Sequence, residues 1–143
     1  MIVSNPYIGD WVASRINGQF DKYSSNALGL LINGDIKAGV IYEDFNKASV
    51  VCHIACEFLS GEFLAAIFDY PFNSLNVNKI ICPVASDNQK SINLVEKMGF
   101  SIEGVLTDCH PNGDILLYTM KKQDCKYLGS KYNGKIKLTA SGT

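Results

Sequence analysis

Arginine and net charge are both nearly absent from this sequence. Arg15 is the one arginine among 143 residues, and the formal net charge is -1 at pH 7. Without a basic field, a chain has little means of attracting nucleic acid or an anionic membrane. No apolar run reaches the roughly 18 residues of a membrane-spanning helix. We therefore expect no membrane association and no nucleic-acid partner, and we interpret the lysines near the C-terminal end as part of a solvated tail.

The five cysteines give little support for disulfides or a metal site. Their number is odd and no secretory signal pattern begins the chain, so we expect reduced thiols in a cytoplasmic protein. Along a strand, Cys52 and Cys56 would share one face while His53 points to the other. Zinc needs four convergent ligands. We therefore predict no metal site, and we interpret Cys52 and Cys82 as buried small hydrophobes.

The first half of the chain predicts a helix followed by an antiparallel meander. Hydrophobic residues make up 47% of the sequence and charged residues 19%, as in an ordinary globular protein. Apolar residues recur at helical spacing in residues 6–16. Three apolar runs follow, and the first two flank Asn33-Gly34, a strong hairpin signal. These runs predict strands at residues 27–32, 36–42 and 49–55.

The second half predicts two helices, a strand between them and a final hairpin. Helical periodicity covers residues 61–72, where Pro71 closes the helix, and residues 88–98, where Gly99 suits a left-handed cap. The predicted strands are 79–84, 100–108 and 115–121. A strand, a helix and a parallel strand form a right-handed crossover, which predicts a mixed sheet. We expect a single domain at residues 1–128 and a flexible tail at 129–143.

The segment from Asn88 to Phe100 carries a family resemblance. It reads NQKSINLVEKMGF and resembles the N-x-x-[SA]-x-x-L-x-E-K-x-G-F motif of the GNAT N-acetyltransferase superfamily. The resemblance extends over about residues 27–121. It implies an α/β (α+β) GNAT fold, with a mixed central sheet, an antiparallel N-terminal meander, a βαβ crossover and flanking helices. The stretches FDYPF and MKKQDCKYL also resemble small GNAT-like proteins of tailed phages, for which the host cytoplasm would be the location.

The resemblance implies an acetyl-CoA-dependent N-acetyltransferase with acetyl-CoA as co-substrate. In such folds the strands around Ile54 and Val84 are parallel and splay apart, and their exposed backbone groups can pair with the pantetheine amides. Asn88 could reach pantetheine as well, or it could only cap its helix. The cofactor-binding residues implied by the resemblance are Ile54, Ala55, Cys56, Ser60, Gly61, Val84, Asn88 and Ser91.

Two parts of the family pattern are missing. GNAT proteins hold the CoA pyrophosphate with an [RQ]-x-x-G-x-[GA] loop, whose backbone N–H groups approach the phosphates at a helix N-terminus. The equivalent residues 55–61 retain only Ser60 and Gly61 as suitable for close approach, and Glu57 adds negative charge. The tyrosine that many members use to protonate the leaving thiolate is replaced by Val95.

His53 is the preferred general base, because histidine exchanges protons near neutral pH and His53 lies on the strand expected to splay. Glu57 is the second candidate. Alternatively, His53 is an ordinary strand histidine and Glu57 a surface carboxylate. Asp108 and His110 border the last hairpin and could face the acceptor or simply form the turn.

The predicted function is transfer of acetyl to a small-molecule or protein amine by direct attack in a ternary complex. The acceptor is not identified by the sequence, and a homodimer is compatible with it. The alternative is a non-catalytic GNAT-fold phage protein that serves as a virion component or binds a host protein. The missing loop residues and Val95 favour this alternative, whereas the intact segment from Asn88 to Phe100 favours the enzyme.

Overall fold

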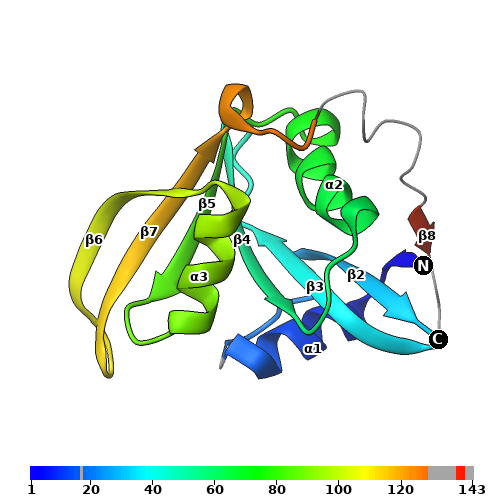
Figure 1. Ribbon diagram of the computed structural model, residues 1–143, viewed down its shortest axis with the longest axis horizontal. Helices are drawn as coiled ribbons and strands as arrows, with labels where there is room; N and C mark the ends of the chain where they lie inside the picture. The colour runs from blue at the N-terminus through cyan, green and yellow to red at the C-terminus, as the bar shows by residue number, and fades with distance from the viewer. Residues whose placement is uncertain (17, 129–137, 141–143) are drawn as a thin grey trace.

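A computed structural model describes residues 1–16, 18–128 and 138–140 (Figure 1). These residues form one mixed sheet of strand order β6-β7-β5-β4-β3-β2-β1-β8 with helices packed on both faces. The helices are α1 (Pro6–Ile16), α2 (Gly61–Asp69) and α3 (Gln89–Met98). The strands are β1 (Ile2–Ser4), β2 (Asn26–Ile32), β3 (Asp35–Glu43), β4 (Ser49–Cys56), β5 (Lys79–Ala85), β6 (Ser101–His110), β7 (Gly113–Lys121) and β8 (Leu138–Ala140).

The antiparallel meander runs from β1 to β4, and the strands predicted from residue 27 onward are confirmed. Asn33 and Gly34 both adopt positive φ angles, 53° and 85°, as a tight hairpin turn requires. β1 adds a short strand that the sequence did not reveal, because three residues are too few to show a periodicity. Its partner on the other side is β8, which runs parallel to it.

The sheet separates two hydrophobic cores. One core lies between the sheet and helices α2 and α3, and the other lies between the sheet and α1. Phe63 and Phe68 of α2 and Met98 of α3 are buried in the larger core. Ile8 and Val12 of α1 are buried in the smaller one. The fold therefore has three layers, which confirms the predicted mixed sheet with flanking helices.

Two glycines let α1 approach the sheet closely. Gly29 of β2 and Gly39 of β3 are directly paired in the register of the two strands. A Cβ atom on Gly39 would lie 2.6 Å from Val12 Cγ2, and one on Gly29 would overlap Ile8. Because neither glycine has a side chain, these two residues of α1 pack directly on the backbone of the sheet.

β4 and β5 begin as paired parallel strands and then diverge. Their register contains three pairs, of which the last is Val51 with Ile81. Beyond that point β4 remains paired with β3 as far as Cys56, and β5 remains paired with β7 as far as Ala85. The facing edges of the two strands therefore carry backbone groups without a strand partner, in the manner of edge strands. The separation is visible between β4 and β5 in Figure 1.

Three boundaries differ from the prediction. The helix predicted over residues 61–72 is α-helical only to Asp69, and a π-helical turn (Tyr70–Ser74) follows, in which Leu75 N–H donates to the Tyr70 carbonyl at 2.9 Å. β7 starts at Gly113, so the last hairpin turn is tighter than expected. Within the predicted tail, Leu138–Ala140 forms β8, whereas 129–137 and 141–143 lie outside the described residues.

No helix within residues 1–16 and 18–128 combines the length and apolar composition required to cross a bilayer.

Candidate active site

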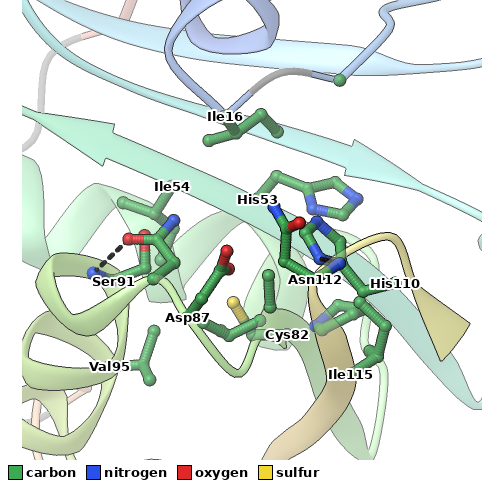
Figure 2. Close-up of a pocket in the computed structure, with 15 residues that line it drawn as sticks. Ile16, His53, Ile54, Cys82, Asp87, Ser91, Val95, His110, Asn112 and Ile115 are labelled. Carbon is green, nitrogen blue, oxygen red and sulfur yellow. Dashed lines mark hydrogen bonds between the residues drawn. The ribbon is translucent and has the colours of Figure 1, made fainter. Parts of the chain in front are cut away.

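A cavity of about 490 Å³ lies where β4 and β5 diverge. Its walls come from both faces of the sheet: His53 projects on the face that α1 covers, while Ile54 and Val84 belong to the core under α2 and α3. In Figure 2, His53, His110 and Asn112 stand on one side and Ser91 on the other. The opening therefore passes through the sheet and joins the two faces.

His53 is paired with Glu43 at the edge of this cavity. The Nε2 atom of His53 lies 2.6 Å from Oε1 of Glu43, and the two side chains are 23% and 31% exposed. The sheet register produces the contact, because Glu43 lies opposite Val51 and is thus the diagonal neighbour of His53 on the same face. When the imidazole is neutral and donates from Nε2, its Nδ1 atom keeps a free lone pair. The arrangement suits a base whose conjugate acid is stabilised by a carboxylate.

Asn88 both caps α3 and lines the cavity. Its Oδ1 atom accepts a hydrogen bond from Ser91 N at 3.1 Å, which confirms the capping interpretation. The Nδ2 group of Asn88 makes no hydrogen bond to any residue in the part of the chain that the structure describes. Asn88 thus has two amide hydrogens available to a ligand in the opening.

A smaller cavity of about 170 Å³ continues from the first toward the end of β4. Ile16, Ile54, Asn88 and Ser91 line both cavities, so we treat the two as one cleft. Six of the eight sequence-predicted cofactor residues border this cleft: Ile54, Ala55, Cys56, Val84, Asn88 and Ser91.

Ser60 and Gly61 line neither cavity. Ser60 caps α2, where its Oγ atom accepts a hydrogen bond from Phe63 N at 3.1 Å. In the loop before α2, the N–H groups of Glu57 and Phe58 donate to the Lys37 carbonyl at 2.7 and 3.1 Å. These two amide groups are therefore hydrogen-bonded to β3. In the family pattern, the N–H groups of this loop bind the phosphates instead.

Glu57 lies at the opposite end of the cleft from His53. It forms an ion pair with Arg15 (3.2 Å) and a longer one with Lys37 (3.9 Å). It borders only the smaller cavity, whereas His53 borders only the larger. The structure thus does not bring the two sequence-predicted bases together.

Of the groups that could donate a proton, only some line the cleft. Tyr118 is buried and donates to Glu96 Oε2 at 2.7 Å; burial first, and then this hydrogen bond, raise the pKa of Tyr118 to about 12. Tyr118 does not line the cleft, and Val95, which does, has no titratable group. His110 lines the cleft, and its Nδ1 atom accepts from Asn112 N at 3.3 Å, which leaves Nε2 to carry the proton of the neutral ring.

Cys52 and Cys82 are buried, in agreement with their interpretation as small hydrophobes. Cys52 and Cys82 directly follow the last paired residues of β4 and β5. A hydrogen bond with Cys82, followed by burial, raises the pKa of Cys52 well above its usual value, so it stays a thiol. Among residues 1–16 and 18–128, no three His, Cys, Asp or Glu side chains gather as metal ligands would.

Sequence reasoning missed Glu43, Arg15 and Asp87 as members of the site. Asp87 follows β5, and Figure 2 shows its carboxylate between the His53 and Ser91 sides of the cleft. A signal for Glu43 existed, since a glutamate near the end of one strand can face a histidine on the next. The contact of Arg15 with Glu57 joins residues 42 positions apart and has no local signal.

Several solved structures that resemble this fold are acetyltransferases. The spermidine/spermine N-acetyltransferase SpeG of Vibrio cholerae is 21% identical, with a TM-score of 0.62 over 83% of this chain and 78% of that one. PseH of Campylobacter jejuni, an N-acetyltransferase solved with acetyl coenzyme A, is 21% identical, with a TM-score of 0.55 over 71% and 70%. A GNAT-family acetyltransferase of Bacillus anthracis is 18% identical, with a TM-score of 0.60 over 82% and 86%.

These identities establish a common fold, and no curated protein matches the sequence significantly. The sequence does match the family model described as an acetyltransferase (GNAT) domain, over residues 35–114. That stretch is more than half of the chain and runs from β3 to the start of β7, so it contains both strands of the opening and α3. The chain therefore belongs to the GNAT acetyltransferase family.

Proposed function

We propose that the protein is an N-acetyltransferase that uses acetyl-CoA as co-substrate and transfers the acetyl group to an amine by direct attack in a ternary complex. The observation that carries the proposal is the opening between β4 and β5, with His53 and its partner Glu43 on one wall and Asn88 on the other. Acetyl-CoA supplies the activated acetyl thioester, and the neighbour PseH was solved with that molecule.

The cleft fits the pantetheine arm in three respects. The facing edges of β4 and β5 offer backbone N–H and C=O groups beyond Val51 and Ile81, so an extended chain with amides can add to them as a strand would. Apolar side chains, including Ile54, Val84 and Val95, line the opening and suit a methylene chain. The uncommitted Nδ2 group of Asn88 offers a further donor.

His53 takes the proton that the acceptor must lose. An amine is protonated at neutral pH and cannot attack a carbonyl until its lone pair is free. His53 accepts that proton at Nδ1, and the Glu43 carboxylate at Nε2 stabilises the imidazolium that forms. A backbone N–H of β4 near Ile54 or Ala55 serves as the oxyanion donor, because the edge of β4 facing the opening is not engaged by β5.

His110 is the candidate for returning a proton to the leaving sulfur. It borders the same cavity as His53 and stands on the same side of it (Figure 2), but it comes from another strand, at the end of β6. This role supplies the proton donor that Val95 cannot provide.

The family and the structural neighbours support an amine as the acceptor. SpeG is named as a spermidine/spermine N-acetyltransferase, and an amine acceptor of low molecular mass would reach the cleft from the His53 side. A protein amine remains an alternative acceptor, since the cleft is open to solvent.

Release of the CoA thiol tests this function directly. Purified protein is incubated with acetyl-CoA and a panel of polyamines, amino sugars and peptides, and free thiol is measured with a chromogenic disulfide. Thiol release that depends on one acceptor, with an acetylated product in the mass spectrum, would support the proposal. Absence of product in every case, together with absence of CoA binding, would favour the non-catalytic binding protein. The negative charge of Glu57 and the occupied loop amides are what favour that second candidate.

A further inference from the structure

Three charged side chains, Arg15, Glu57 and Lys90, line the end of the cleft that lies beyond β4, and a fourth, Lys37, contacts Glu57. Arg15 comes from the end of α1, Lys37 from β3 and Lys90 from the first turn of α3, while Glu57 follows β4. Lys90 is close enough to Cys56 to oppose the effect of burial, which raises the pKa of that thiol. Two cations and one carboxylate line this end of the cleft, and Lys37 adds a third cation beside Glu57, so this end is locally basic in a chain whose net charge is -1.

The Arg15 side chain is held in position by a contact within its own helix. Its guanidinium carbon lies 3.7 Å from the centroid of the Trp11 ring, one helical turn earlier. The close packing of α1 on the paired glycines fixes the direction of this turn. Arg15 is therefore held at the cleft by α1, and its guanidinium does not depend on Glu57 alone for its orientation.

The ion pairs of Glu57 with Arg15 and Lys37 are partly exposed to solvent. The side chain of Glu57 is 47% exposed, and its partners Arg15 and Lys37 are 40% and 36% exposed. Exposed ion pairs of this kind contribute little free energy, and they are readily exchanged. A phosphate group competes well for such an arginine, because it accepts two parallel N–H···O bonds.

We propose that Glu57 occupies the position of the CoA diphosphate, and that Arg15 and Lys37 exchange Glu57 for the diphosphate when CoA binds. The inference rests on the proposed function and assigns the phosphate-side residues that the eroded loop does not provide. The loop amides of Glu57 and Phe58 are bound to the Lys37 carbonyl, so side chains must take over part of their role. In this arrangement Arg15 and Lys37 bind the diphosphate. Glu57 competes with the diphosphate for them and so lowers the affinity for CoA.

The test is calorimetric titration of wild type, Glu57→Gln and Arg15→Ala with CoA and with pantetheine, which lacks the diphosphate. Glu57→Gln keeps the side-chain shape and removes the charge, so CoA should bind about fivefold more tightly, while Arg15→Ala should bind CoA about tenfold more weakly. Pantetheine affinity should change in neither variant. Lys22→Ala is the matched control, since Lys22 also lies against an aromatic ring, Tyr23, but away from the cleft.

The outcomes separate this inference from the proposed function. Unchanged CoA affinity in Glu57→Gln, or an equal change for pantetheine, would overturn the exchange while leaving CoA binding intact. If Glu57→Gln bound CoA and the wild-type protein did not, the result would support competition between Glu57 and the diphosphate most strongly. No binding of CoA or pantetheine to any variant would overturn both. A melting curve of each variant confirms that it is folded before titration.

Discussion

The imidazole of His53 lies 2.6 Å from the carboxylate of Glu43, and this pair stands at the edge of the opening between β4 and β5. The two residues come from adjacent antiparallel strands and share a face of the sheet. A histidine held by a carboxylate has a fixed orientation and a stabilised cationic form, which are the properties required of a base that accepts a proton from an ammonium group.

Removing the carboxylate should lower turnover without affecting CoA binding. Glu43→Gln leaves a hydrogen-bond acceptor for Nε2 but no charge to stabilise the imidazolium, so we expect kcat to fall about tenfold or more with CoA affinity unchanged. His53→Ala should give a larger loss, and the double variant should be no worse than His53→Ala, because the two residues act as a unit. Additive losses, measured by thiol release, would show that Glu43 acts independently of His53.

Asn88 and Ser60 offer a matched pair of helix caps. Each accepts a hydrogen bond from the backbone near the start of its helix, so substitution by alanine should cost about 1 kcal/mol of stability in either case. Only Asn88 lines the cleft. We therefore expect Asn88→Ala, but not Ser60→Ala, to weaken CoA binding in calorimetry. Equal CoA affinities in the two variants would show that Asn88 only caps its helix and does not bind CoA.

His110 should affect catalysis through the leaving group. If it returns the proton to sulfur, His110→Ala should lower kcat while leaving the KM for the amine and the affinity for CoA near their wild-type values. The defect should shrink with an acyl thioester whose thiol has a lower pKa, because such a thiolate departs without protonation. An equal loss of kcat with both thioesters would show that His110 does not protonate the leaving thiolate.

Gly39 should be sensitive to a single methyl group. A Cβ at this position would lie 2.6 Å from Val12 and 3.0 Å from Ile8, so Gly39→Ala must displace α1 at a cost of about 1–3 kcal/mol. Gly61→Ala is the control, since no atom lies within 4 Å of its would-be Cβ. Denaturant unfolding measures both; a Gly39→Ala variant as stable as Gly61→Ala would show that α1 tolerates displacement from the sheet.

The buried phenol of Tyr118 should make stability depend on alkaline pH. Burial and the hydrogen bond to Glu96 raise its pKa to about 12 in the folded protein, above the value of about 10 in an unfolded chain. The folded state thus favours the protonated phenol, and this stabilisation is complete below about pH 10 and is lost as the pH rises toward 12. Tyr118→Phe should weaken that dependence and keep turnover intact, while Tyr42, whose pKa burial also raises well above its usual value, should retain its own contribution. Loss of turnover in Tyr118→Phe would show that this phenol takes part in catalysis.

The local parts of the fold were predictable from the sequence. The Asn33-Gly34 turn, the N-cap at Asn88 and the left-handed Gly99 each depend on a few adjacent residues, and each has its expected conformation. Because the segment from Asn88 to Phe100 also resembles the family, it led to the correct fold.

The contacts that complete the site were not predictable. The pairing of His53 with Glu43 depends on the register between β3 and β4. The loop between these strands contains Asp44 and Lys47 at positive φ angles, a conformation that is unusual for lysine. The contact of Arg15 with Glu57 depends on where α1 crosses the sheet. From the sequence alone, Glu57 is a candidate base. The structure places it at the end of the cleft opposite His53, in contact with Arg15.

Thermal unfolding with and without acetyl-CoA tests the central claim most directly, because a ligand that binds only the folded state raises its stability. At a concentration near 100 times Kd, acetyl-CoA should stabilise the wild-type protein by about 2.7 kcal/mol and shift the melting temperature upward by several degrees. Asn88→Ala should show a smaller shift at the same concentration. An unchanged melting temperature of the wild-type protein at millimolar acetyl-CoA would contradict a cofactor site between β4 and β5.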